Sequence, residues 1–193
     1  MVKSQEHMIE EVIMNAPQTT DTSTDYRIHP QTYVGHVHLR VANLERSLDF
    51  YRDILGFQIN QDMRTEPTPR KVVCLSANQY HHHVALAEFA GVTPQTSQQA
   101  GLFHVAFAYP NRWELARAVK HILDHDYPID TYHEYGIGEA VNLRDPDGIP
   151  LELYYDRPES EWPRVDGQIR AFNKRVDADT ILAELENEPP AAG

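Results

Sequence analysis

The sequence predicts an α+β protein in which two tandem βαβββ modules form one bowl-shaped domain of mixed sheets around a shared cleft. Short stretches that alternate between apolar and polar residues indicate strands, and each set includes one amphipathic helical stretch. The order strand, helix and three strands occurs twice. The two copies are in register, because His36 precedes the helix-capping Asn43 by seven residues and His104 precedes Asn111 by seven, a period near 68 residues.

Composition places the chain in an ordinary globular class. It has 193 residues, of which 41% are hydrophobic, enough for one domain with a core. No apolar run approaches the roughly 20 residues that span a bilayer, and the N-terminus lacks the features of a signal peptide. The net charge of −12 argues against nucleic acid or an anionic membrane as a partner. Cys74 is the single cysteine, so we expect no internal disulfide and a cytoplasmic protein.

Shifts in composition predict the domain boundaries. Residues 1–30 are polar and predict a disordered N-terminal arm. Residues 31–156 form the predicted domain, with modules at about 33–90 and 101–156 joined by the Gly-, Pro- and Gln-containing linker GVTPQTSQQAG. Residues 157–193 are a polar tail that ends in a possible short helix, DTILAELENE. We expect this tail to pack on the outside of the domain or on a partner subunit.

The first module begins with the strand VGHVHLRV, in which His36 and His38 share one face and the valines and leucine share the other. Asn43 is placed to cap a helix, NLERSLDFYRDILGF, whose apolar residues form one stripe. Gly56 is placed to end that helix. The stretches FQINQDM, RKVVCLSA and HHHVALAEF complete the module as three strands.

The second module repeats this pattern. Its first strand, GLFHVAFAYP, puts His104 on the same face as the two alanines. Asn111 is placed to cap the helix NRWELARAVKHILDH, with Glu114 as its capping-box partner. The three strands that follow are predicted near residues 129–133, 140–143 and 150–155.

The last strand carries a carboxylate that needs an explanation. The turn DPDG, residues 145–148, precedes the strand LELYY, in which Glu152 interrupts an apolar run. A carboxylate on a buried face is costly unless a partner meets it, although Glu152 could instead lie on a solvated face. His36 and His104 open equivalent strands of the two modules, so they are the candidate partners. Two imidazoles and one carboxylate suit non-haem Fe(II), and Zn²⁺ takes the same ligands as a Lewis acid.

Three stretches resemble a known family: GHVHLRVANLERSLDFYRDILGF, GLFHVAFAYP and DPDGIPLELYYDRP. They look like the vicinal oxygen chelate superfamily, which includes glyoxalases, bleomycin-resistance proteins and extradiol dioxygenases. More narrowly they resemble type I extradiol, catechol 2,3-dioxygenase-like proteins, over about residues 31–165. The resemblance implies a metal cleft with His36, His104 and Glu152 as ligands, and Fe(II), or alternatively Mn(II), as the metal.

The same resemblance implies catalytic residues. The family's acid–base histidine lies in a run matched by HHHVAL, where His82 aligns best. His81 and His83 are the alternatives, because a shift of one residue in the alignment would place either of them at this position. The segment TYHEYGIGEAVNLRDPDGIPLE matches the extradiol signature and makes His133 a catalytic residue. The signature tyrosine is replaced here by Asn142, whose amide can donate a hydrogen bond but is no acid.

Substrate contacts and partners follow from the resemblance as well. It implies that His38, His83, Tyr135 and Tyr154 bind substrate, and either tyrosine is placed to substitute for the missing one. The implied activity is ring cleavage of a small aromatic diol with O₂, in aromatic catabolism, by a homo-oligomer, a dimer or larger. Two alternatives stay open: a metal-dependent glyoxalase- or thiol-transferase-like enzyme, and a non-catalytic binding protein for a small aromatic or drug.

Overall fold

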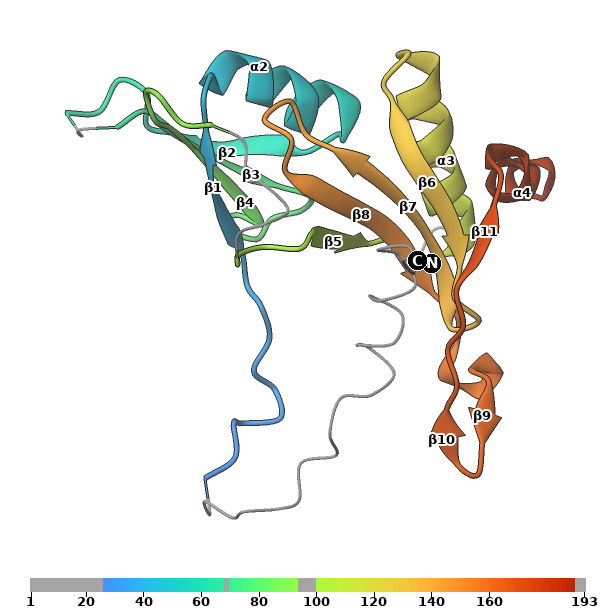
Figure 1. Ribbon diagram of the computed structural model, residues 1–193. Coiled ribbons are helices and arrows are strands. Elements are labelled where there is room, and N and C mark those ends of the chain that lie inside the picture. The colour runs from blue at the N-terminus through green and yellow to red at the C-terminus, as the bar shows by residue number, and fades with distance from the viewer. Residues whose placement is uncertain (1–25, 68–69, 94–99, 190–193) are drawn as a thin grey trace, which may run out of the picture. The chain divides into compact units, whose positions relative to one another are not determined.

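The computed structural model describes residues 26–67, 70–93 and 100–189 (Figure 1). The chain divides into a short unit, residues 1–34, and a main unit, residues 35–193. In the short unit, the described residues form no helix or strand, and their one backbone hydrogen bond is a turn in which the Thr32 amide donates to the His29 carbonyl. Most of the predicted N-terminal arm lies outside the described residues.

The first sheet contains the four strands of the first module in the order β1-β4-β3-β2. Their bounds are Val37–Val41 for β1, Gln58–Asp62 for β2, Val72–Ser76 for β3 and Val84–Glu88 for β4. β1 runs parallel to β4, and the other pairs are antiparallel. The sheet is therefore mixed. The helix after β1 carries the chain back, so β2 runs in the same direction as β1, and the antiparallel pairs β2–β3 and β3–β4 then make β4 parallel to β1.

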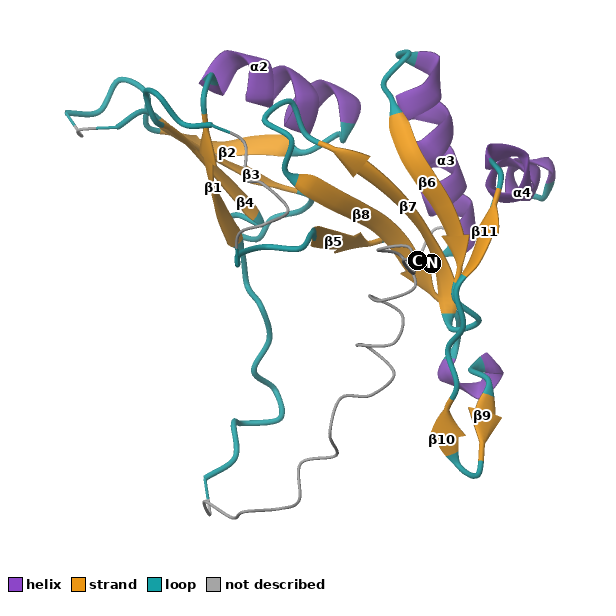
Figure 2. Cartoon of the chain, viewed as in Figure 1, coloured by secondary structure: helices purple, strands orange, loops and turns teal. Residues whose placement is uncertain are grey.

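The second sheet has the order β11-β6-β7-β8-β5. The bounds are Val105–Ala108 for β5, Ile129–Glu134 for β6, Gly138–Arg144 for β7, Pro150–Asp156 for β8 and Lys174–Val176 for β11. β5 runs parallel to β8, so this sheet is mixed too. These two sheets confirm the predicted α+β class (Figure 2). The sequence did not predict β11, nor the small hairpin of β9, Arg164–Val165, and β10, Gln168–Ile169.

The first helix of each module begins where the sequence places its cap. The bounds are Leu44–Leu48 for α2, Asp49–Ile54 for the π-helix η1, Arg112–Asp124 for α3, Ala178–Leu182 for α4, and Glu159–Glu161 and Ala183–Glu186 for the 3₁₀ turns η2 and η3. The Asn43 side chain accepts from the Arg46 amide, and the Asn111 side chain accepts from the Glu114 amide, both at 2.9 Å. Both caps are confirmed.

The helix of the first module departs from the prediction of a regular α-helix. From Asp49 it widens into π turns, in which the Leu55 amide donates to the Phe50 carbonyl at 3.0 Å. The neighbouring side chains Phe50 and Tyr51 are both buried, at 2% and 0% exposure. Gly56 ends the helix with φ of 82°, as predicted.

One hydrophobic core is shared by the two modules. The Phe50 and Tyr127 rings lie 4.7 Å apart, and the Phe57 and Phe107 rings lie 5.1 Å apart, each pair joining the first module to the second. The apolar faces of both sheets line this core, so the alternate residues, including the histidines of interest, lie on the opposite faces. In the described part of the chain, no helix is long and apolar enough to cross a membrane.

Candidate metal and substrate site

The clearest feature of the candidate site is a histidine–carboxylate pair on the second sheet. In the β5–β8 register Ala106 lies opposite Glu152, and His104 precedes Ala106 by two residues, so both side chains lie on one face. His104 Nε2 is 3.5 Å from Glu152 Oε2. The Glu152 side chain is 13% exposed and that of His104 is 32% exposed. His104, one of the two predicted candidates, is therefore a partner of the carboxylate in the last strand.

His36 lies in a separate histidine cluster on the first module. Its ring centroid is 4.3 Å from that of His82 and 6.0 Å from that of His81. The Nδ1 atoms of His81 and His82 are 2.8 Å apart and share a hydrogen bond. Burial lowers the pKa of His82, and the charge of His36 lowers it further. The predicted acid–base residue thus contacts a predicted ligand.

The donor set fits a metal in part. An imidazole nitrogen beside a carboxylate oxygen is a common pair of ligands for iron, manganese or zinc. However, the described residues contain no group of three or more His, Cys, Asp or Glu side chains arranged to hold a metal ion. The structure brings together His104 and Glu152, and it groups His36 with His82 instead.

Asn142 and Tyr135 adjoin Glu152. Asn142 lies directly opposite Glu152 in the β7–β8 register. Burial and then the charge of Glu152 raise the pKa of the Tyr135 phenol, which forms side-chain hydrogen bonds with Asn142 and Glu152. A tyrosine hydroxyl therefore stands next to the amide at the position where the extradiol signature has its tyrosine. Of the two tyrosines suggested as substitutes, Tyr135 makes these contacts.

His133 is held by the C-terminal tail. Its Nδ1 is 2.6 Å from Asn173 Oδ1, just before β11, and its ring stacks on Tyr135 with centroids 5.6 Å apart and planes at 7°. The Phe172 amide donates to the Tyr135 carbonyl at 3.1 Å, which anchors the same segment. The sequence analysis missed Asn173, because nothing local in a polar tail indicates which strand edge it will join.

The remaining predicted substrate contacts lie in different surroundings. His83 is engaged by the first module, because its Nδ1 is 2.8 Å from Ser76 Oγ. Tyr154 lies on the Glu152 face of β8, opposite Ala140, and burial raises its pKa. His38 lies on β1 and lines a pocket on the first sheet. The set is therefore spread over the polar faces of both sheets.

These features define a two-module α+β protein with a histidine–carboxylate pair at the edge of one mixed sheet. The chain belongs to the glyoxalase/bleomycin resistance protein/dioxygenase superfamily, whose family model matches residues 33–153. This match covers both modules, with His36, His104 and Glu152 inside it, and it leaves out Asn173.

Individual relatives carry dioxygenase names. The chain is 34% identical over 167 residues to a catechol-2,3-dioxygenase of Bacillus subtilis (strain 168), covering 83% of this chain and 55% of that protein. It is 26% identical to a manganese-dependent 2,3-dihydroxybiphenyl 1,2-dioxygenase of Geobacillus genomosp. 3, covering 67% of this chain and 38% of that protein. The chain thus spans about half the length, or less, of these two relatives.

A solved structure shares the fold. A glyoxylase/bleomycin resistance protein/dioxygenase domain from Frankia sp. EAN1pec superposes with a TM-score of 0.55 at 23% identity, covering 65% of this chain and 98% of that one. At this identity the likeness establishes the fold alone, and it confirms the predicted architecture of paired βαβββ modules.

Proposed function

We propose that the protein is a metal-dependent extradiol-type dioxygenase that cleaves a catechol-type aromatic diol with O₂. The observation that carries this proposal is the contact of 3.5 Å between His104 Nε2 and Glu152 Oε2 on the polar face of the second sheet. The dioxygenase names of two relatives support the same reaction class.

A metal ion, Fe(II) or Mn(II), would be held by His104 and Glu152, with His36 as the third ligand. The His36 side chain is exposed, so its ring can turn away from His82 without disturbing the core. When bound, the ion supplies the redox chemistry with O₂ and lowers the pKa of the diol hydroxyls. Imidazole and carboxylate ligands suit both metals, which makes the choice between them a matter for measurement.

His82 is the proposed acid–base residue. Its Nδ1 is engaged with His81, so proton transfer takes place at Nε2. A neutral imidazole can accept a proton from a diol hydroxyl and return it to the product. The lowered pKa of His82 keeps the ring neutral at pH 7, because burial disfavours the charged form.

Residues on the second sheet orient the substrate. His133 donates from Nδ1 to Asn173, which leaves Nε2 as an acceptor for a substrate hydroxyl. Tyr135 supplies a hydroxyl beside Asn142 and Glu152 and takes the place of the family tyrosine. Tyr154 lies on the same face of β8 as Glu152, and His38, the proposed contact from the first module, lies on the polar face of the first sheet. His83, a further substrate contact proposed from the sequence, is hydrogen-bonded to Ser76 at the loop before β4.

Anaerobic reconstitution tests the proposal. Metal-free protein is loaded with Fe(II) or Mn(II) and mixed with catechol or 3-methylcatechol in aerated buffer, and the visible spectrum is recorded. We expect a yellow ring-cleavage product that is lost in the His104→Ala variant and retained in His125→Ala, a matched change at the exposed end of α3. Protein that binds metal at His104 and turns over neither diol would refute the dioxygenase assignment.

A further inference from the structure

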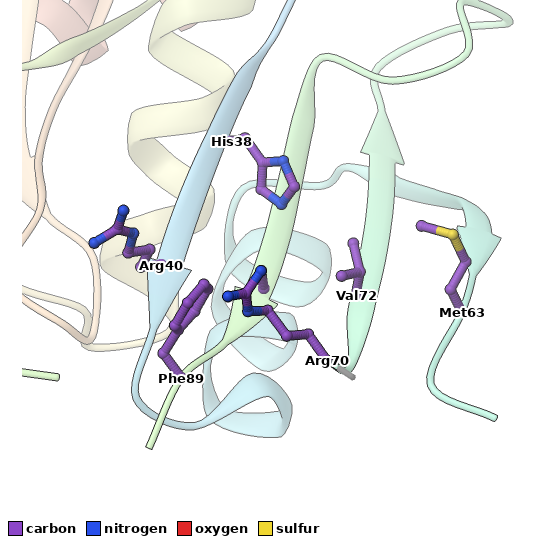
Figure 3. A pocket seen from close by; sticks show the side chains of 7 residues that line it. His38, Arg40, Met63, Arg70, Val72 and Phe89 are labelled. Carbon is purple, nitrogen blue, oxygen red and sulfur yellow. The ribbon is translucent and has the colours of Figure 1, made fainter. Parts of the chain in front are cut away.

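A second binding feature lies on the polar face of the first sheet. It is a cavity of about 480 Å³ whose lining combines two arginines and a histidine with apolar side chains (Figure 3). The lining residues are His38, Arg40, Met63, Arg70, Val72, Ala87 and Phe89. No carboxylate is among them, although the chain carries a net charge of −12. A basic, partly apolar cavity in an acidic protein calls for an anionic, partly apolar ligand.

The register of the sheet creates this cavity. Ala87 on β4 lies between Arg40 on β1 and Val72 on β3. Residues directly opposite in paired strands point to the same face, so the three side chains rise together. The central one is only a methyl group, and the space above it stays open between its larger neighbours. The cavity is thus a consequence of a small residue on the middle strand.

The two guanidinium groups are held by an aromatic ring. Arg70 Cζ lies 4.5 Å from the centroid of the Phe89 ring, and Arg40 Cζ lies 5.3 Å from it. In Figure 3 the ring stands between the two arginine side chains. A cation–π contact positions a guanidinium group over the face of a ring. The shared Phe89 ring therefore holds both guanidinium groups beside the cavity, where their N–H donors can meet an anion.

Most of the described arginines of the protein form an ion pair with a carboxylate. Arg46 pairs with Asp147, and Arg112 pairs with Glu139 and Glu184. Among the described residues, Arg40 forms no ion pair with a carboxylate. Its charge is thus available to a ligand, and a guanidinium fork matches the two oxygens of a carboxylate.

We propose that this cavity binds the carboxylate of an aromatic diol that carries a short acidic side chain. The inference rests on the proposed function and narrows its substrate class. Met63, Val72 and Ala87 provide an apolar surface for the methylene groups of such a chain, and Arg40 and Arg70 bind its carboxylate.

The spacing along β1 fits a substrate of this size. His36, His38 and Arg40 occupy alternate positions and point to one face. At about 3.3 Å per residue, Arg40 lies roughly 13 Å along the strand from His36. An arginine side chain covers part of that distance. A diol ring held near His36 therefore needs a chain of only a few carbons to bring its carboxylate to the arginines.

Paired substrates test the proposal. Steady-state kinetics are measured with 3-(3,4-dihydroxyphenyl)propionate and its methyl ester, in the wild type and in the Arg40→Gln and Arg70→Gln variants. We expect the ratio of kcat/KM for acid over ester to fall by about tenfold or more in each variant, mainly through KM, because a charge-assisted hydrogen bond is lost. The ester should change less than about twofold. Lys120→Gln, which removes an equal charge from α3, should leave the ratio unchanged.

Two outcomes overturn the proposal: no preference for the acid in the wild type, or an unchanged ratio in both arginine variants. If no diol is turned over, calorimetry with 3-(4-hydroxyphenyl)propionate and its methyl ester decides the question separately. Binding of the acid that is lost in Arg40→Gln supports the anion site even where the dioxygenase proposal falls. Equal or absent binding of acid and ester refutes the anion site itself.

Discussion

Replacement of Tyr51 by phenylalanine removes one hydroxyl from the junction between the modules. That hydroxyl donates to Asp145 Oδ2 over 3.2 Å, and the two residues are 0% and 4% exposed. A hydrogen bond to a charged, buried acceptor contributes about 1.5–3 kcal/mol. In a chain of this length each kcal/mol lowers Tm by about 2–4 °C, so we expect Tyr51→Phe to lower Tm by roughly 3–12 °C.

The stability lost in Tyr51→Phe should depend on pH. Burial raises the pKa of Asp145, and the Tyr51 hydroxyl is one of the hydrogen bonds that oppose this rise. Because the pKa is higher in the folded state, ionised Asp145 reduces stability, and that cost disappears as the pH falls below the unfolded value of 3.8. Removing the hydroxyl increases the cost. The difference in free energy of unfolding between wild type and Tyr51→Phe should therefore be largest at pH 7 and smaller in acid.

Urea denaturation at pH 7 and in acid measures both effects. Tyr127→Phe is the matched control, because its hydroxyl donates to the Arg144 carbonyl at 2.9 Å near the surface, where water can replace it. We expect this control to lose less than about 1 kcal/mol. Equal losses in the two variants, or no loss in Tyr51→Phe, would refute the reasoning.

Three further changes test other parts of the structure. The Glu88 carboxylate accepts a hydrogen bond from the Leu44 amide at 3.0 Å, and this bond lowers the pKa of Glu88. The bond stabilises the fold above the unfolded pKa of 4.5, and this stabilisation is lost as the pH falls through the folded pKa. Denaturation of Glu88→Gln should therefore show a cost of about 0.5–1 kcal/mol at pH 7 and none in strong acid. Asn173→Ala should lower kcat/KM for the diol about tenfold with unchanged circular dichroism, because His133 loses its orienting acceptor, and Asn173→Asp should restore it; a failed rescue contradicts this positioning role. His104→Ala should lose bound Fe(II) or Mn(II) in metal analysis, and full occupancy would contradict its assignment as a ligand.

Much of the fold could be predicted because its signals are local. Asn43 and Asn111 cap helices through their own side chains, and Gly56 adopts a positive φ that other residues avoid. Gly148 likewise takes a φ of 80° in the DPDG turn, where its amide donates to the Asp145 carbonyl at 2.9 Å. Each of these features depends on a few neighbouring residues, so a single sequence contains all the information needed.

The candidate site could be predicted only in part. The alternation of polar and apolar residues put Glu152 and His104 on one face of their strands, and the structure brings the two together. It could not specify that His36 would turn toward His82, since rotamers are chosen by packing between segments. Nor could it specify that Tyr135, rather than Tyr154, would meet Asn142.

The sequence by itself determined the repeat, the helix caps, the turns and which residues share a strand face, because these follow from backbone sterics and from a side-chain period of two. Only the tertiary structure decided that the tail adds β11 to β6 and brings Asn173 to His133, 40 residues away. It also decided that Ala87 would leave a cavity between Arg40 and Val72. These contacts depend on strand register across long loops, and the closure of a long loop places almost no constraint on the residues within it.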